Sequence, residues 1–367
     1  MLEKLLSYLD KSKGSDLYIS VGLPPTIKLN GRLESLSEDD LIADDIYELL
    51  ESAMDEDSFV EFRRKKEANF ALHIPEIGRF RFSAFMQKDY PGIVIRRIQE
   101  KIPTFEDLLL PEQLKEACMA KRGLILFVGA TGAGKSSTQA AMIGYRNKHS
   151  SGHIFTVEDP IEFVHEHARS VVTQREVGLD TDSFEEALRN SLRQAPDVIV
   201  QGEIRTRETM EFALNFAGTG HLCMATLHAN NANQALDRIL HLVPKGLHRQ
   251  FLYDLSVNLK AIVAQQLIPT PDGKGSRAAF EILFNTPTVA NAMRKGELQE
   301  LKQIMASSTE HGMQTFDQAL FKLYSDGRIS YIEALAHADS ENDLRLMIKL
   351  EIGTESKPNS LSNLTIN

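Results

Sequence analysis

Cysteine is scarce in this chain, where Cys118 and Cys223 are the only two among 367 residues. They form no C-x-x-C pair, which excludes a disulfide framework and a tetracysteine zinc site. We expect both thiols to be reduced residues of a protein core.

Long hydrophobic runs are also missing, and none approaches the roughly 20 residues that cross a bilayer. The longest run, residues 123–130, is bounded by glycines and is short enough to be a buried strand. The first residues lack the basic region, apolar stretch and cleavage site of a signal peptide. We therefore expect a cytoplasmic chain with no direct membrane span.

No excess of basic side chains is present, because 51 acidic and 41 basic residues give a formal net charge of −10. Such a field repels nucleic acid and anionic lipid unless a local basic patch overrides it. No basic stripe with interleaved aromatic residues occurs, so we expect no nucleic-acid partner. The remaining composition is that of a globular protein, and the length suggests two domains.

Residues 1–100 predict an N-terminal α+β domain. Residues 1–12 carry apolar side chains at helical spacing, and residues 37–52 predict an acidic amphipathic helix with Ser37 as its N-cap. Asn30-Gly31 is a typical hairpin turn. The expected strands of this domain cover residues 16–20, 26–29, 69–73, 80–86 and 92–98.

The proline-bracketed residues 101–112 predict an inter-domain linker, after which the pattern changes to strand, glycine-rich turn and helix. This alternation predicts an α/β core over residues 113–286, with a mostly parallel sheet covered by helices. A helical region over 287–351 and a mobile polar tail over 352–367 are expected to follow. The expected core strands cover residues 124–128, 153–157, 198–201 and 222–227.

The strongest motif is Gly129-Ala130-Thr131-Gly132-Ala133-Gly134-Lys135-Ser136, which fits G-x-x-x-x-G-K-[ST] between a buried strand and a helix-compatible segment. Glycines let successive backbone N–H groups wrap a phosphate, and the helix aims its positive end at the same anion. Lys135 would reach the β- and γ-phosphates of ATP, and Ser136 would ligate Mg²⁺. The predicted nucleotide-binding residues are Gly129, Ala130, Thr131, Gly132, Ala133, Gly134, Lys135, Ser136 and Ser137.

A second apolar strand supplies a candidate acid. Residues 197–203 end in Glu203, as expected where a strand of the same sheet carries the carboxylate on the Mg²⁺ side. An acid after an apolar strand is more often a solvated loop residue, so this prediction depends on the phosphate loop.

Three further segments make the chain similar to secretion and pilus ATPases. Residues 156–162, Thr-Val-Glu-Asp-Pro-Ile-Glu, resemble their acidic box, and Gly202-Glu203-Ile204-Arg205 resembles their Walker B motif. Residues 219–228 resemble their histidine box. These segments follow the phosphate loop in the family's order. The resemblance implies an α/β, RecA-like P-loop ATPase core and an N-terminal PAS-like α+β domain.

Within that superfamily the chain resembles the pilus-retraction, or twitching-motility, branch of PilT and PilU, because it lacks a tetracysteine element. A degenerate C-terminal motif at residues 286–294 and the continuation beyond residues 312–315 favour the PilU side. The resemblance implies an ATP-hydrolysing motor that powers or assists type IV pilus retraction. It also implies a homohexamer, a paralogous retraction ATPase as partner, and peripheral docking on an inner-membrane pilus platform protein.

The resemblance implies roles for two carboxylates and two histidines. Glu162 would be the general base or the water-orienting group, and Glu203 would hold Mg²⁺ through water. A surface role for Glu162 is the alternative. His221 and His228 would sense the γ-phosphate or couple it to domain movement. Their spacing fits two residues flanking a strand equally well.

Two arginines of the N-terminal domain complete the implied set. Arg81 and Arg96 would point toward the ATP phosphates, which a guanidinium can bind in bidentate fashion. Their spacing fits a solvated sheet face equally well. We expect hydrolysis to move the two domains about the linker.

Two rival functions stay open. One is a nucleic-acid-dependent RecA-like ATPase, which the acidic charge disfavours. The other is a structural ring component that binds nucleotide without productive turnover. Lys135, Glu162 and Glu203 count against this rival, and the degenerate C-terminal motif leaves it open.

Overall fold

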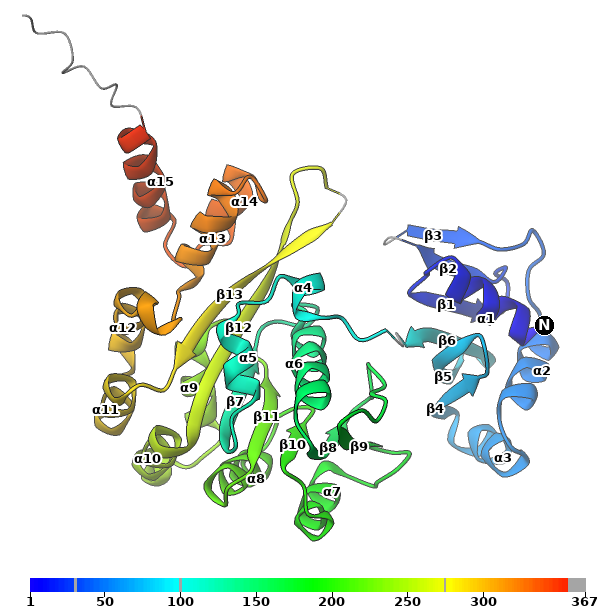
Figure 1. Ribbon diagram of the computed structural model, residues 1–367. Helices are drawn as coiled ribbons and strands as arrows, with labels where there is room; N and C mark the ends of the chain where they lie inside the picture. Colours follow the sequence, from blue (N-terminus) through cyan, green and yellow to red (C-terminus); the bar gives the residue numbers. More distant parts are fainter. Residues whose placement is uncertain (30–31, 99–100, 274, 356–367) are drawn as a thin grey trace, which may run out of the picture. The chain divides into compact units, whose positions relative to one another are not determined.

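A computed structural model describes residues 1–29, 32–98, 101–273 and 275–355 (Figure 1). The chain divides into two compact units, the first formed by residues 1–102 and 162–164 and the second by residues 103–161 and 165–367. The hairpin turn predicted at Asn30-Gly31 lies outside the described residues. Helix α15, Glu341–Glu355, includes the first four residues of the predicted tail, and residues 356–367 lie outside the described part.

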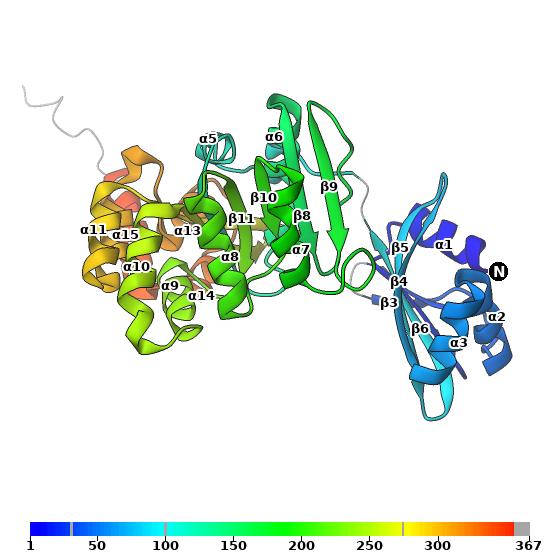
Figure 2. The same cartoon turned by 90° about the horizontal axis from the view of Figure 1, so that it is seen from below.

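The first unit is a six-stranded antiparallel sheet in the order β3-β2-β1-β6-β5-β4. Figure 2 shows its three helices on one face of the sheet. Its elements are α1 (Leu2–Lys11), β1 (Asp16–Ser20), β2 (Thr26–Leu29), β3 (Arg32–Ser35), α2 (Ala43–Ala53), α3 (Glu56–Lys65), β4 (Glu67–Ile74), β5 (Gly78–Gln87) and β6 (Tyr90–Ile98).

Strand alternation decides which side chains of this sheet are buried. On β5, Phe80 and Phe82 lie in the core, so the intervening Arg81 belongs to the opposite face. Arg81 is the direct cross-strand partner of Arg96 on β6, and the two arginines therefore share that face. The predicted solvated-face pattern and the predicted strands both agree with this arrangement.

The prediction of Ser37 as a helix N-cap is wrong. Helix α2 begins at Ala43, with Ile42 as its N-cap and Asp45 accepting the Ile42 N–H at 2.9 Å. Leu41 forms a β-bridge with Val21, and residues 36–40 before it form bends and irregular structure in place of a helical turn. Helix α3 was not predicted from the sequence.

The second unit contains a seven-stranded sheet in the order β13-β12-β7-β11-β10-β8-β9, parallel except for the β12–β13 pair. Neither β9, β12 nor β13 was expected from the sequence. The strands are β7 (Gly123–Val128), β8 (Gly152–Glu158), β9 (Ser170–Glu176), β10 (Val198–Gln201), β11 (Leu222–Leu227), β12 (Leu259–Pro269) and β13 (Ser276–Phe284).

Helices cover both faces of this sheet, as the α/β prediction requires (Figure 1). Alternate residues of β7 enter different cores, with Ile125 and Phe127 on the side of the first three helices and Leu126 on the other. The first group is α4 (Phe105–Leu108), α5 (Gln113–Cys118) and α6 (Lys135–His149), and the second includes α7 (Phe184–Ser191), α8 (Arg207–Gly218), α9 (Ala232–His241) and α10 (His248–Asn258).

The C-terminal helices pack at the outer edge of the sheet. Ile282 of β13 and Gln314 exchange two backbone hydrogen bonds, of 2.9 and 3.2 Å, which pair the edge strand with the segment before α13. No helix within the described residues is long and apolar enough to cross a membrane. The C-terminal helices are α11 (Pro287–Lys295), α12 (Leu301–Ser307), α13 (Phe316–Ser325), α14 (Tyr331–Ala336) and α15.

Candidate nucleotide-hydrolysis site

The phosphate-loop motif connects β7 to α6 at the carboxyl edge of the parallel sheet. Gly129 has φ of +156° and Gly134 has φ of +88°, conformations that favour glycine. A Cβ on Gly129 would lie 2.7 Å from the Gln265 carbonyl oxygen, so the loop tolerates no side chain there. The loop backbone therefore approaches β12 so closely that only glycine fits at position 129.

The start of α6 is suited to an anion. Its N-cap, Gly134, offers no side-chain oxygen to the first N–H groups, and the first turn contains no acidic residue. The other predicted loop residues, Ala130, Thr131 and Gly132, are exposed, while Ser136 and Ser137 are half-buried. The N-terminal N–H groups and the helix dipole favour a phosphate at this position.

Lys135 is the buried cation of the loop. Its Nζ donates to the carbonyl oxygens of Gly129 and Ala130 at 2.8 and 2.9 Å, so the side chain folds back over the loop. Ala133 of the same loop is also buried. The ammonium group is therefore held where a phosphate bound by the loop meets a positive charge.

Glu203 and His228 come together from two neighbouring strands. Glu203 follows β10, His228 follows β11, and His228 Nε2 lies 3.2 Å from Glu203 Oε1. Burial is the main cause that lowers the pKa of His228, and the positive charge of Lys135 lowers it further. The lowered pKa favours the neutral form of the imidazole, whose Nε2 lies beside the Glu203 carboxylate. The effect of the Lys135 charge places His228 in the neighbourhood of the phosphate-loop lysine.

Arg205 links this pair to the acidic box. Its Nε lies 2.8 Å from Glu203 Oε2, and its Nη1 lies 3.5 Å from Asp159 Oδ2. Both oxygens of Glu203 are thus engaged, one by a guanidinium and one by an imidazole. Neither Arg205 nor Asp159 was predicted to be a site residue, although both lie inside recognised motifs.

His221 is separated from this cluster by the length of a strand. It precedes β11, and Gly123, at the start of β7, donates its N–H to the His221 carbonyl at 3.1 Å. The phosphate loop follows the other end of β7, about 20 Å away at the usual rise per residue. The two histidines flank a strand, and only His228 lies at the carboxyl edge.

Glu162 lies in a short segment that follows the acidic-box strand. Ile161 N–H donates to Glu176 Oε2 at 3.1 Å and His165 N–H donates to Gln174 Oε1 at 2.7 Å, so β9 anchors both flanks. Glu162 itself is exposed, and its carboxylate makes no ion pair or hydrogen bond with any residue that the structure describes. The Glu162 carboxylate is thus available to a ligand or to water.

The two predicted arginines differ in their partners. Arg96 Nε donates to Asp16 Oδ1 at 2.7 Å, and the Asp16 side chain is only 5% exposed. Ser15 also donates its hydroxyl to Asp16 at 2.9 Å. Arg81, beside it, has no ion-pair partner among the residues described. One guanidinium is therefore held in place, whereas the other is available.

Protein ligands alone do not enclose a metal ion, since the described residues contain no cluster of three or more histidine, cysteine or acidic side chains suited to one. Ser136 and Glu203 offer one hydroxyl and one carboxylate. This donor set fits Mg²⁺, which retains several waters and is completed by substrate phosphates.

Comparison with known proteins supports this arrangement. The family model described as type II/IV secretion system protein matches residues 39–341. The type IV pilus ATPase PilU of Pseudomonas aeruginosa is 60% identical over 363 residues, covering 99% of this chain and 94% of that protein. The type IV pilus retractation ATPase PilT of the same organism is 38% identical, covering 90% and 95% respectively.

The fold comparison gives the same result. The crystal structure of the pilus retraction motor PilT with bound ADP has a TM-score of 0.87 and 38% identity, covering 93% of this chain and 99% of that one. The Legionella pneumophila ATPase DotB has a TM-score of 0.76 and 25% identity over 95% of each chain. The predicted RecA-like P-loop core is thereby confirmed.

Proposed function

Because this chain belongs to the type II/IV secretion system protein family, we propose that it is an ATP-hydrolysing motor of the type IV pilus retraction machinery. The observation that carries the proposal is the meeting of the phosphate loop, Glu203 and His228 at one edge of the parallel sheet. The 60% identity to PilU favours the accessory, paralogue-dependent role within that machinery.

The loop residues would bind the phosphates of ATP. Backbone N–H groups at the start of α6 and the Lys135 ammonium would neutralise the β- and γ-phosphates. Ser136 and, through water, Glu203 would hold Mg²⁺, which supplies charge neutralisation between the phosphates. His228, neutral beside Glu203, would respond to the γ-phosphate. We assign His221 to the support of β11, because its contacts are those of a helix end.

Water activation would fall to Glu162, since its exposed carboxylate is available in a segment anchored on both sides by β9. Arg81 and Arg96 would supply guanidinium groups to the phosphates as negative charge shifts in the transition state. We propose that hydrolysis moves the two units about the start of the predicted linker, near residue 102, because Phe105 and Leu110 are buried in the second unit.

Assembly and location belong to the same proposal. A homohexameric ring would act on the cytoplasmic side of the inner membrane, associated peripherally with the pilus platform protein. A paralogous retraction ATPase would be its working partner, and no nucleic acid would be required. The acidic net charge of −10 supports the last point.

The proposal is tested by turnover of the purified chain with Mg·ATP. We expect phosphate release from the parent chain, and we expect it to disappear in Lys135→Ala and on chelation of Mg²⁺. DNA at low salt should not stimulate this phosphate release. Nucleotide binding without turnover, under all conditions including added paralogue, would identify a structural ring component. Strong stimulation by DNA would identify a nucleic-acid-dependent ATPase.

Deletion of the gene tests the cellular role. Pili should extend but retract with less force or frequency, and the effect should depend on the presence of the paralogue. Normal retraction in both backgrounds would contradict the accessory role. A tagged chain tests the docking partner. It should stay in the cytosol when the pilus machinery is deleted and lie at the membrane when the machinery is present.

A further inference from the structure

Glu281 is a buried acid in β13 that takes no part in the nucleotide site. The residue is 1% exposed, and burial raises the pKa of its carboxyl group to about 7. Burying a carboxyl group here costs folding free energy compared with an apolar residue of similar size, unless hydrogen bonds compensate the lost hydration.

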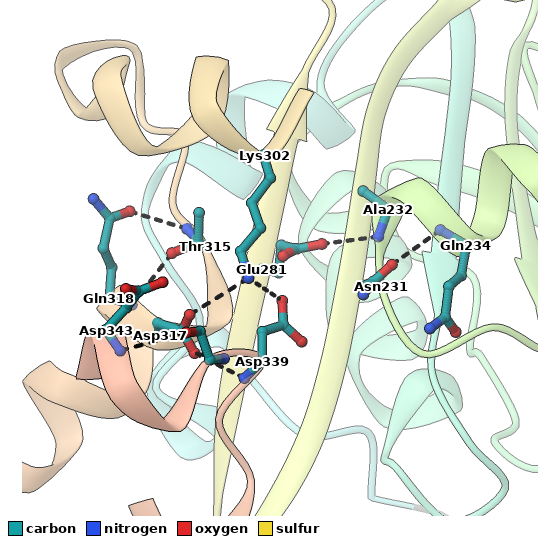
Figure 3. A network of polar contacts seen from close by, with 11 residues as sticks. Asn231, Ala232, Gln234, Glu281, Lys302, Thr315, Asp317, Gln318, Asp339 and Asp343 are labelled. Atoms are coloured by element: carbon teal, nitrogen blue, oxygen red, sulfur yellow. Dashed lines mark hydrogen bonds and ion pairs between the residues drawn. The ribbon is translucent and has the colours of Figure 1, made fainter. Parts of the chain in front are cut away.

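One contact of Glu281 fixes the start of α9. Its Oε1 accepts the N–H of Ala232, the first residue of that helix, at 2.8 Å (Figure 3). Asn231 caps the same helix end by accepting the Gln234 N–H at 2.9 Å. Two of the N–H groups at this helix end are therefore satisfied, one of them by a side chain from a strand.

The start of α9 is close in sequence to the nucleotide site. Residues 228–231 are all that separate β11 from α9, and the first of them is His228. Asn230 N–H donates to Gln234 Oε1 at 3.2 Å, which pins this short loop to the helix. A displacement of Ala232 therefore moves the backbone that carries His228.

The other side of Glu281 faces the C-terminal helices. Its neighbour Ile282 exchanges backbone hydrogen bonds with Gln314, two residues before α13 begins. Lys302 of α12 lies 3.4 Å from Asp317 of α13 and 3.0 Å from Asp339, which precedes α15 (Figure 3). Asp317 also accepts the Asp339 N–H at 2.8 Å. These charges join α12, α13 and the segment before α15 beside Glu281.

We propose that Glu281 is a positioning residue that couples the C-terminal helices to the loop carrying His228. The proposal rests on the proposed ATPase function. The ionised carboxylate is a stronger acceptor for the Ala232 N–H than the protonated acid, so ionisation of Glu281 tightens the start of α9 and with it the His228 loop. Movement of the C-terminal helices and of the nucleotide loop would thus affect one another.

The charged groups that face Glu281 decide in which direction each substitution should shift its pKa. Asp339 raises the pKa of Glu281, whereas Lys302 and the backbone of Ala232 and Phe316 lower it. Asp317 acts through its ion pair with Lys302. Removing the lysine charge should therefore favour the protonated form, and removing the Asp339 charge should favour the ionised form.

The test varies Mg·ATP from limiting to saturating concentrations and measures kcat and KM of the full-length chain at each pH from 5.5 to 8.5. We expect a fall in kcat on acidification with a midpoint near pH 7, absent in Glu281→Gln. That variant should lose about fivefold in kcat above pH 7.5, with KM changed less than twofold, a size typical of coupling between sites. Lys302→Met should move the midpoint up by roughly half a pH unit and Asp339→Asn should move it down.

The matched control is Lys295→Met, because Lys295 pairs with Glu297 on an exposed surface and its charge change is the same. It should leave the midpoint in place. A parental kcat and pH profile in Glu281→Gln would overturn the coupling. If that variant does not fold, identical midpoints in Lys302→Met and Asp339→Asn would overturn it instead. A parental chain without any turnover would instead overturn the ATPase function.

Discussion

Thr138, in the first turn of α6, donates its hydroxyl proton to Gln265 Oε1 of β12 at 2.7 Å, across 127 positions of sequence. Both residues are buried, and a Cβ on Gly134 would lie 2.6 Å from Gln265 Nε2. Gln265 therefore contacts both the phosphate loop and the helix that follows it. This bond fixes the loop against the neighbouring strand.

Loss of one partner of this bond should cost more than loss of both. Thr138→Val leaves the Gln265 amide unsatisfied in the interior, and Gln265→Met does the same to the hydroxyl. Each should destabilise the second unit by about 1–3 kcal/mol and raise KM for ATP. The double variant should cost less than the sum of the two single variants. Urea unfolding of all four proteins, with and without nucleotide, completes the cycle, and strict additivity would contradict the expected coupling.

The carboxylate of Glu162 should act on water rather than on binding. Glu162→Gln keeps the shape of the side chain but removes its basicity, so we expect kcat to fall at least about a hundredfold with nucleotide affinity retained. Single-turnover hydrolysis and nucleotide titration measure the two effects separately.

Glu166→Gln is the matched control for that experiment. Glu166 is also exposed and lies on the same segment, four residues further on, so its substitution makes the same change of charge. It should leave kcat within about twofold, as surface substitutions usually do. Equal losses in the two variants would indicate an effect of the surface charge, and a parental rate in Glu162→Gln would remove Glu162 from catalysis.

The arginines of the first unit should respond differently to substitution. Arg81→Ala should lower kcat by about a hundredfold or more with little change in nucleotide affinity, because its guanidinium would act mainly in the transition state. Asp16→Asn should weaken the hold on Arg96 and lower kcat by a smaller factor. Arg64→Ala, on the exposed end of α3, is the control. Hydrolysis at the parental rate in Arg81→Ala would exclude that residue from the mechanism.

The sequence was sufficient to predict those parts of the site that are contiguous in the chain. The phosphate loop is one run of eight residues between a strand and a helix, so its glycines and Lys135 identify it locally. Four expected core strands lie within one residue of β7, β8, β10 and β11. The parallel sheet then places the ends of β10 and β11 together, which brings Glu203 beside His228.

Other parts of the site depend on contacts that no local pattern records. Gln265 meets Thr138 only because β12 lies beside β7, and β12 itself is mostly apolar, without a distinctive period. The sequence alone did not show which of His221 and His228 lies at the carboxyl edge of the sheet, because this depends on the direction of β11 within the sheet. Ser37 failed as a cap because Leu41 pairs with Val21, a tertiary contact that overrides local preference.

Glu281 should make the stability of the second unit depend on pH. Its pKa is about 7 in the folded chain and has an ordinary value of 4.5, so the folded state binds the proton more tightly. Below about pH 4.5 both states are protonated and burial of the acid costs no charge. The penalty grows as the pH rises from 4.5 to 7 and reaches at most about 3 kcal/mol above it.

Glu281→Gln removes this charge, so its Tm should exceed that of the parent at pH 8, and the difference should shrink toward pH 5. Thermal unfolding at both pH values measures it, with Glu297→Gln as a partly exposed control that should give no pH-dependent difference. An equal Tm difference at pH 5 and pH 8 would show that the acid is not buried in its charged form. The expected gain in stability accompanies the expected loss in kcat, and such a trade-off distinguishes a functional buried charge from a structural one.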